Sequence, residues 1–482
     1  MRPVAFSSRT ARPSHDAGAR RGPFAEWYGP QLSTEWSASR ERVLMQRRSA
    51  DLAANDWIAV SAVNAITQNA IGIGLKPSSC IPAARLGLSP EDAASLGETM
   101  EWIWDRWSRH ADVTGQRTFE ELQTAALRSI LVMGEALHLP VMTDQDGISL
   151  AIQSIAPGRL RTPALYAADP AVRDGIRFDG AGRPQAYYIA DSLQDSQSML
   201  SDSDLSCRFL AVPAKILRRP GIFHLFRKSM DEQVRGLPIF APSASLFRLL
   251  DDSLHYELLA QAMASKFPIF ITREDRSPEA MAAEGVYQGQ EQEEEPVYYT
   301  DTDGPQFMYG NAGEKPEVLK NERPSPNFLA FTKTILNGVA SSCGIPYIAL
   351  TNDFSEVNYS SARAAMNEAW RTYKWWRQFI AESYCQPIWA MVMEEAWLTG
   401  ELRLPAGIDF YRDQYLLCSC TWTGPARGYV DPVKEIQADI LAISNHLMTR
   451  REAMAAAGRD YDDELPVIKR EEEDFSNDDT QN

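Results

Sequence analysis

Two helical segments enclose a strand-like stretch, and this order constrains the fold more than any other feature of the chain. Residues 118–140 and 239–265 each repeat apolar side chains at spacings of three and four, which is typical of amphipathic helices. The repeating positions are Phe119, Leu122, Ala126, Ile130, Met133 and Leu137 in the first segment and Leu246, Leu250, Leu254 and Leu258 in the second. Between them, residues 148–155 alternate like a half-buried strand, and residues 175–190 read as a hairpin around a glycine-rich turn. The sequence therefore predicts an α+β fold with a β-rich insert between two helices.

Cap and turn residues predict where the helices begin and end. Ser89 and Pro90 are typical of a helix start, and Thr118 with Glu121 forms a capping box for the helix that follows. Further helices are expected over residues 90–110, 39–70 (closing at Gly72 and Gly74), 327–342 (closing at Gly344-Ile345-Pro346) and 360–398 (kinked at Pro387).

The length of the chain and the composition of its ends bound its organisation. A chain of 482 residues is too long for one hydrophobic core, so we expect two or three structural units. Residues 1–38 are rich in Arg, Ser, Pro and Gly and are expected to form a flexible arm, and residues 462–482 are expected to form an acidic, disordered tail.

The net charge of −17 argues against tight nucleic-acid binding. Proteins that bind DNA tightly are usually basic, because affinity comes from Lys and Arg side chains that neutralise phosphates. The chain is therefore expected either to ignore DNA or to handle it without gripping it. The six cysteines are scattered without a CxxC pair, and no run of 18 apolar residues occurs, so we expect neither a zinc site nor a membrane span.

No motif points to catalysis, a cofactor or a metal. The P-loop, HExxH, GxSxG and Rossmann patterns are missing from the sequence. Asp301 and Asp303 begin like a calcium loop but lack the glutamate twelve positions in, and Asp353 with Glu356 is more often a capping or ion-paired carboxylate than a catalytic pair. We expect no enzyme, cofactor or metal site, although a dyad assembled from distant histidines stays open.

One long segment resembles a known family. Residues 344–363 read GIPYIALTNDFSEVNYSSAR, and this is similar to the hallmark of lambda-type portal proteins of tailed bacteriophages, in which a GIPY turn precedes a DFS-x-x-NYSSAR loop. The likeness extends to residues 175–189, 235–262 and 422–438, which are similar to the family's hairpin, to the helix that follows it and to a C-terminal VDPxKE signature. Together these segments span most of residues 40–470.

The resemblance implies the family's anatomy of wing, stem, clip and crown. It divides the chain into an N-terminal arm (1–38), the first part of the wing (39–117), stem helix 1 (118–142), the clip (143–236), stem helix 2 (237–266), the wing with a channel-facing loop (267–358), a C-terminal helical wing and crown (359–461) and the acidic tail (462–482). The tryptophans Trp370, Trp375, Trp376 and Trp389 are expected to act as core or interface anchors.

The resemblance also implies a function and partners. It predicts the subunit of a homo-oligomeric ring, a dodecamer, that forms the channel for viral double-stranded DNA at the capsid vertex. The expected partners are the terminase large subunit, the head-completion or neck protein, and the major capsid and scaffold proteins, with no membrane. Assembly is expected in the host cytoplasm. A different multimeric phage connector or adaptor is the alternative, and an enzyme with an unseen site is a third reading.

The residues expected to matter fall into two groups. Lys315, Lys320 and Arg323 are the candidates for contact with DNA from a loop that reaches into the channel. The structural motif is expected to comprise Gly344, Pro346, Asp353, Asn358, Ser360, Ser361 and Arg363. Asn358 or Ser360 is expected to cap the helix that starts there. Arg363 is expected to pair with Asp353 or Glu356, so Arg363→Ala should destabilise the ring or its assembly.

Overall fold

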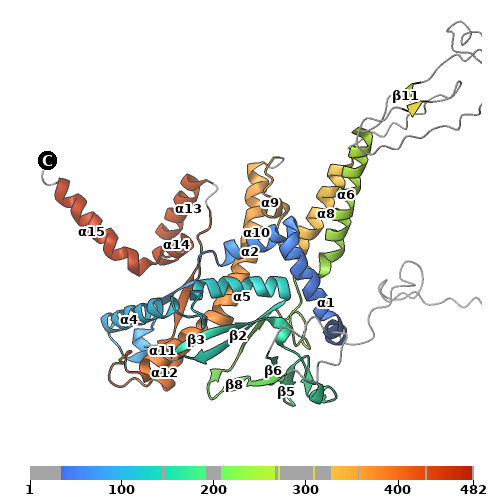
Figure 1. Ribbon diagram of the computed structural model, residues 1–482. Coiled ribbons are helices and arrows are strands. Elements are labelled where there is room, and N and C mark those ends of the chain that lie inside the picture. The colour runs from blue at the N-terminus through green and yellow to red at the C-terminus, as the bar shows by residue number, and fades with distance from the viewer. Residues whose placement is uncertain are drawn as a thin grey trace, which may run out of the picture. The chain divides into compact units, whose positions relative to one another are not determined.

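The computed structural model describes residues 34–143, 147–191, 208–265, 270–271, 308–309, 327–355, 358–428 and 431–479. The chain divides into two compact units, one made of residues 1–241 and 343–482 and the other of residues 242–342. The elements named in the text are labelled in Figure 1 where there is room.

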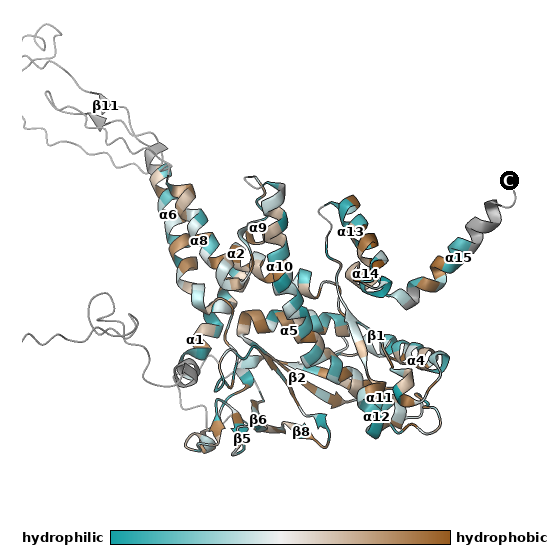
Figure 2. Ribbon diagram, turned by 180° about the vertical axis from the view of Figure 1, so that it is seen from behind, coloured by the Kyte–Doolittle hydropathy of each residue, from teal (hydrophilic) through white to brown (hydrophobic). Residues whose placement is uncertain are grey.

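The smaller unit is built on two long helices. α6 (Ala244–Ser265) and α8 (Phe328–Cys343) lie side by side in both Figure 1 and Figure 2. They approach closely, since a Cβ added to Gly338 would lie 2.9 Å from Cδ1 of Leu246. The short strands β11 (Phe270–Ile271) and β12 (Met308–Tyr309), which belong to the sequence between the helices, pair in parallel.

The larger unit contains two principal sheets. The first has the strand order β10-β2-β3, with β2 at Glu135–Met142, β3 at Leu150–Ile155 and β10 at Phe223–Phe226, all antiparallel. The second has the order β4-β5-β6-β7, with bounds Val172–Arg173, Ile176–Phe178, Pro184–Ala190 and Phe209–Pro213. The hairpin expected over residues 175–190 is confirmed as β5 and β6.

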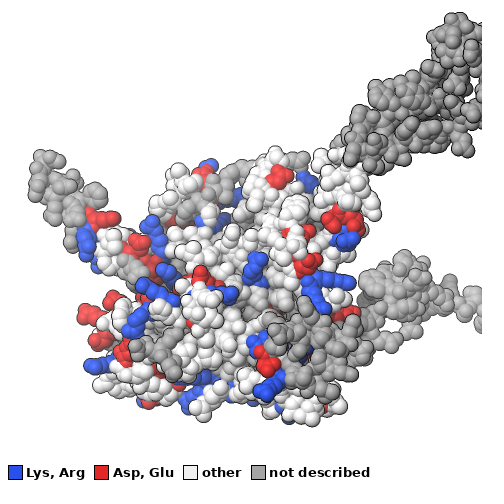
Figure 3. All heavy atoms as spheres, viewed as in Figure 1, with Lys and Arg blue, Asp and Glu red and all other residues white. Residues whose placement is uncertain are grey.

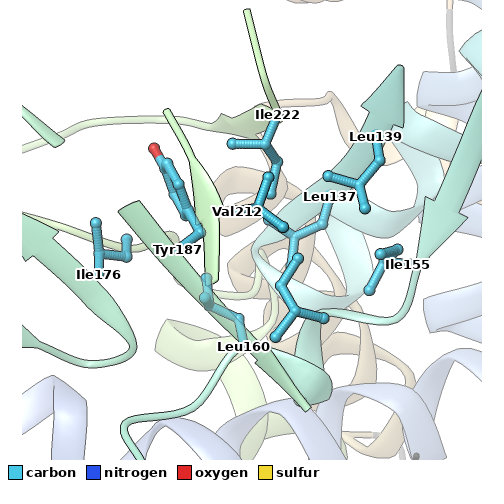
Figure 4. Packing of buried hydrophobic residues seen from close by; sticks show 9 residues of the cluster. Leu137, Leu139, Ile155, Leu160, Ile176, Tyr187, Val212 and Ile222 are labelled. Atoms are coloured by element: carbon cyan, nitrogen blue, oxygen red, sulfur yellow. The ribbon is translucent and has the colours of Figure 1, made fainter. Parts of the chain in front are cut away.

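Apolar side chains from the two sheets form a shared core. Leu137, Leu139 and Ile155 from the first sheet meet Ile176, Tyr187 and Val212 from the second, as Figure 4 shows. This packing explains the alternation seen in the sequence, because every second side chain of a strand faces the core.

The helix predicted over residues 118–142 is shorter than expected. α5 (Phe119–Met133) begins at the capping box of Thr118 and Glu121 but ends at Gly134, whose φ of +88° is the left-handed conformation that commonly stops a helix. Residues from Glu135 onward form β2 instead. Leu137 had been counted in the helical repeat, but the spacing of a few apolar residues does not distinguish the end of a helix from the start of a buried strand.

The single helix expected over residues 39–70 is divided into two. The segment 39–70 forms two helices, α1 (Thr34–Asn55) and α2 (Trp57–Ala70). The break is at Asp56, whose carboxylate accepts hydrogen bonds from the N–H groups of Ile58 and Ala59 and so caps α2.

The predicted helix over residues 90–110 is confirmed as α4 (Pro90–Ser108).

The C-terminal half is mostly helical. Its elements are α9 (Tyr347–Thr351), α10 (Tyr359–Ile380), a π-helical turn (Ala381–Cys385), α11 (Gln386–Leu398), α12 (Phe410–Leu417), α13 (Pro432–Ser444), α14 (Arg450–Ala456) and α15 (Tyr461–Asp479). The kink expected at Pro387 takes the form of the π-helical turn, with Pro387 in the first turn of α11. Strand β13 (Cys420–Thr423) pairs with β1 (Lys76–Ser79), and α3 (Ala83–Leu86) follows β1.

The acidic tail departs from its prediction. Residues 462–482 were expected to be disordered, yet α15 covers Tyr461–Asp479. The Glu, Lys and Arg residues from Glu464 to Glu472 favour a helix, because these straight-chain side chains lose little freedom in it. Charge alone therefore does not predict disorder for this segment.

An aromatic cluster forms the second part of the core. The Trp104 ring lies 4.9–5.6 Å, centroid to centroid, from the rings of Trp107, Phe119, Trp389 and Trp422. Trp389 is fully buried and Trp376 nearly so, which makes both core residues, whereas Trp375 is 45% exposed. The expectation that tryptophans anchor the core holds for these two.

His138 is a buried neutral histidine whose titration should affect stability. Burial, and then the charge of Arg117, lower its pKa to about 4, while its Nδ1 lies 2.5 Å from the hydroxyl of Tyr384. Because the pKa is lower in the folded state than in the unfolded chain, its contribution is present above pH 6.5 and is lost as the pH falls through 4.

We therefore expect the free energy of unfolding to fall by about 2 kcal/mol between pH 7.5 and pH 5 because of this group. Urea unfolding at the two pH values, for the natural protein and for His138→Gln, measures it. The variant should show the smaller fall. Equal falls in the two proteins would contradict the assignment.

Candidate functional site

The segment 344–363 forms a helix, a turn and the start of a second helix. Gly344 adopts a φ of +72°, and its carbonyl accepts a hydrogen bond of 2.6 Å from the Thr372 hydroxyl of α10. Pro346 then precedes α9 as its N-cap residue. The chain is thus turned sharply and tied to α10, as the predicted stop at Gly344 and Pro346 requires.

α9 is fixed against α2. Ile348 and Leu350 are buried, and the Ser61 hydroxyl of α2 donates a 2.6 Å hydrogen bond to the carbonyl of Leu350. α9 ends at Asn352, whose φ of +54° is a left-handed conformation that asparagine tolerates better than most residues. The turn that follows therefore begins at a helix that is packed against α2.

The turn after α9 is exposed and carries no cation. Asp353 accepts hydrogen bonds from the backbone N–H and the hydroxyl of Ser355, at 3.0 and 2.6 Å, and Phe354 is 56% exposed. The sequence from 352 to 358, NDFSEVN, holds two acids and no Lys or Arg. Asp353 therefore shapes the turn, in agreement with its interpretation as a structural carboxylate.

Asn358 starts α10 as predicted. Its side chain accepts a 2.9 Å hydrogen bond from the N–H of Ser361, and the Ser361 hydroxyl lies 3.0 Å from the same oxygen. Of the two candidate caps, Asn358 and Ser360, the structure selects Asn358; Ser360 is exposed in the first turn.

Of the two partners predicted for Arg363, the structure describes only Asp353. Among the described residues it forms no ion pair with Asp353, and Glu356 lies outside them. Arg363 also lies near Asp431, the N-cap residue of α13. The pKa of Asp431 is below its usual value, first because Lys434 donates hydrogen bonds to it and also because Arg363 is close. Arg363 is exposed and Asp431 is only half-buried, so this interaction is weak in water.

Two residues that the sequence did not single out hold the segment in place. Thr372 binds the carbonyl of Gly344, as described above. Arg377 of α10 donates hydrogen bonds to the carbonyls of Asn69, Ala70 and Pro425, at 2.9–3.1 Å, and so closes the C-terminal end of α2. No spacing rule could have found them, because their partners are backbone groups up to 308 residues away.

A cavity of about 440 Å³ lies between α2, α9 and α10. Trp57, Phe354, Met366 and Tyr373 are among the side chains around it, and none of its described lining residues is charged. Such a lining offers apolar, amide and hydroxyl groups, and no ionised side chain.

The remaining candidates cannot be placed. Lys315, Lys320 and Arg323 lie outside the described residues. Within the described part of the chain, no cluster of three or more His, Cys, Asp or Glu side chains could hold a metal ion. None of the described helices is both long and apolar enough to cross a membrane. On the face shown in Figure 3, the acidic and basic side chains are interspersed.

The chain is similar to known proteins of phage particles. A family model described as phage portal protein, lambda family, matches residues 20–377, so the chain is a structural protein of a phage particle. The chain belongs to the lambda family of phage portal proteins, and its role is that of a portal-vertex subunit. Membership of this family implies a structural rather than an enzymatic role.

The curated relatives agree over nearly the whole chain. The portal protein of Escherichia phage N15 is 22% identical over 92% of this chain and 86% of its own length. Portal protein B of Escherichia phage lambda is 21% identical over 91% of this chain and 85% of its own length. A solved structure titled as the neck of a native gene transfer agent (GTA) particle computed with C12 symmetry matches 87% of this chain and 94% of its own at 13% identity, with a TM-score of 0.39.

Proposed function

We propose that the chain assembles with copies of itself into a closed ring whose channel carries viral double-stranded DNA during packaging and ejection. Membership of the portal family carries this proposal. A single chain closes a ring when one surface binds a different surface of the next copy and the rotation returns to the start. The expected number of twelve subunits remains a prediction.

The charge of the chain supports passage of DNA rather than capture. Each copy carries a net charge of −17, and the exposed turn at 352–355 contains Asp353 and no cation. A wall of the same sign as the phosphates displaces few counterions and so gains little affinity. Contact with DNA by Lys315, Lys320 and Arg323 stays a proposal beside this.

We assign the stem differently from the first expectation. Residues 118–142 contain helix α5 followed by strand β2 rather than one continuous helix, whereas α6 of the second segment begins at Ala244 in the smaller unit. The helices that do lie together are α6 and α8. We therefore propose α6 and α8 as the stem, residues 266–327 between them as the clip, and the sheets of residues 135–226 as part of the wing.

The partners follow from this anatomy as proposals. The clip would bind the terminase large subunit during packaging and the head-completion or neck protein afterwards, and the wing would contact the major capsid and scaffold proteins. The virion vertex would be the final location, after assembly in the host cytoplasm.

Native mass spectrometry and electron microscopy of the purified full chain test the ring. We expect one closed oligomer and an annulus with an open channel wide enough for B-form duplex. The same ring should not retain linear duplex at physiological salt, which a mobility assay would show. A chain that stays monomeric at all concentrations would refute the proposal.

A further inference from the structure

The hairpin of β8 (Lys215–Ile216) and β9 (Arg219–Pro220) has an unusual tip. Ile216 pairs with Arg219, so only Leu217 and Arg218 form the turn. The Leu217 side chain is 97% exposed and its φ is +55°. Two-residue hairpin turns place Gly, Asn or Asp at such a position, because a Cβ is strained there.

Both features of Leu217 are unfavourable in an isolated chain. A leucine at this position strains the backbone and leaves a large apolar side chain in water, together with Ile216, which is 53% exposed. Glycine would remove both costs. A partner that buries the leucine would offset them, so the tip has the properties of an anchor.

The surroundings of the tip are basic. Lys215 and Arg218 are exposed on either side of Ile216 and Leu217. The next arginine, Arg219, is neutralised by Glu394 at 2.7 Å, whereas Arg218 lies over the Tyr411 ring with its charge exposed. The tip, residues 215–218, thus forms a knob with two exposed cations and an apolar centre. Its charge is complementary to a surface rich in carboxylates.

The larger unit also contains a hollow with the complementary chemistry. A cavity of about 770 Å³ opens between α4, the segment 72–77 and the segments 423–426 and 457–464. Five carboxylates line it, from Glu98, Glu101, Asp105, Asp460 and Glu464, against two cations, Lys76 and Arg459. Glu98 and Asp105 are exposed on α4.

The hollow has apolar walls as well. The apolar lining residues are Ile73, Pro77, Trp102 and Pro425. Of these, Trp102 is 59% exposed and Ile73 is 88% exposed. Trp104 also lines the cavity, and its buried indole Nε1 has no hydrogen-bond partner among the described residues. β8 and α4 lie well apart in both Figure 1 and Figure 2, so the knob does not fill the hollow of its own chain.

We propose that the β8–β9 hairpin of one copy inserts Leu217 into the α4 hollow of the next copy, with Lys215 and Arg218 facing Glu98 and Asp105. A knob and a hollow on different parts of one chain make the head-to-tail contact that a closed ring requires. This inference rests on the proposed ring and names one of its contacts.

Leu217→Gly separates the contact from folding. Glycine suits the positive φ, so the thermal midpoint of the subunit should stay the same or rise. The concentration at which half of the subunits are in rings should rise at least tenfold, as expected for loss of a buried anchor. Leu165→Ala, which truncates a leucine that is 84% exposed elsewhere, is the control and should leave assembly unchanged.

A charge exchange identifies the partner surface. Lys215→Glu with Arg218→Glu, and separately Glu98→Lys with Asp105→Lys, should each weaken assembly about tenfold or more. Mixing the two variants should restore assembly in rings where they alternate. There the acidic knob of the first variant faces the basic hollow of the second, and the natural knob of the second faces the natural hollow of the first. Native mass spectrometry of differently labelled variants measures the mixed species.

The outcomes keep this inference distinct from the proposed function. If the natural chain forms no ring, the proposed function fails. If it forms rings and Leu217→Gly assembles as well as the natural chain, or the mixed variants are not rescued, the contact proposed here is wrong and the ring stands. Loss of capsid or scaffold binding with unchanged rings would also overturn the contact between copies.

Discussion

Replacing Arg235 with methionine is expected to lower the free energy of unfolding by about 3–5 kcal/mol, because it leaves a buried carboxylate without its main counter-charge. Glu135 at the start of β2 is fully buried, and the guanidinium of Arg235 spans both of its oxygens, with Nε 3.0 and 3.1 Å away. Burial alone would raise the pKa of Glu135. The charge of Arg235 and hydrogen bonds from His224 and Arg235 outweigh burial and hold this pKa far below its usual value.

The pair belongs to a network that joins distant parts of the larger unit. Arg235 also donates to the carbonyls of Leu160 and Pro157, at 2.7 and 3.0 Å. Arg42 of α1 donates to Asp174 and to the carbonyl of Gly236, at 2.7 and 2.6 Å. Removing Arg235 therefore leaves buried carbonyls unpaired in addition to Glu135, which is why the expected loss is large.

The control is the same substitution at an exposed pair. Arg371→Met breaks the bond of 2.9 Å to Glu368 on α10, where both side chains are more than two thirds exposed, and should cost less than about 0.5 kcal/mol. Denaturant unfolding of the two variants gives the comparison. A loss below about 1 kcal/mol for Arg235→Met would show that the pair is not buried as described.

The double variant Glu135→Gln with Arg235→Met should recover part of the loss, since no bare carboxylate remains. Acid should also weaken the natural protein through Glu135. A lowered pKa contributes stability above the unfolded value, and this stability is lost as the pH falls toward the folded value. The double variant should lack this part of the acid dependence.

The sequence predicted elements whose signals are local. The capping box of Thr118 and Glu121, the strand at β3, the hairpin of β5 and β6, and the helix stop at Gly344 and Pro346 are all confirmed. Each depends on residues within a few positions of one another, so a single sequence contains the whole signal. The portal family was likewise indicated by one continuous segment, residues 344–363.

The sequence did not reveal what depends on contacts between distant segments. Glu135 was read as helical, although its role comes from Arg235, one hundred residues later. The pairing of α6 with α8, separated by 62 residues of sequence between Ser265 and Phe328, was likewise missed. Periodicity shows that a helix has an apolar face, but it does not say which partner covers that face.

Gly236→Ala is expected to cost at least about 4 kcal/mol, or to prevent folding, because two backbone segments cross there without room for a methyl group. A Cβ on Gly236 would overlap the carbonyl oxygen of Gly134 and lie 2.6 Å from its carbonyl carbon. Neither atom can move alone, because Gly134 ends α5 and the N–H of Ile239 is bonded to the carbonyl of Leu131 at 2.9 Å. The crossing also places the Gly236 carbonyl against Arg42.

Gly180→Ala is the matched control for this crossing. Gly180 lies in the exposed turn between β5 and β6, its φ is not positive, and nothing lies within 4 Å of an added Cβ. Both substitutions reduce the freedom of the unfolded chain equally, so their difference isolates the overlap in the folded state. Denaturant unfolding should leave Gly180→Ala within about 1 kcal/mol of the natural protein. If Gly236→Ala lowered the free energy of unfolding no more than Gly180→Ala, the two backbone segments could not lie in contact. The hydrogen bond from Arg42 to the Gly236 carbonyl, which depends on this crossing, would then also be in doubt.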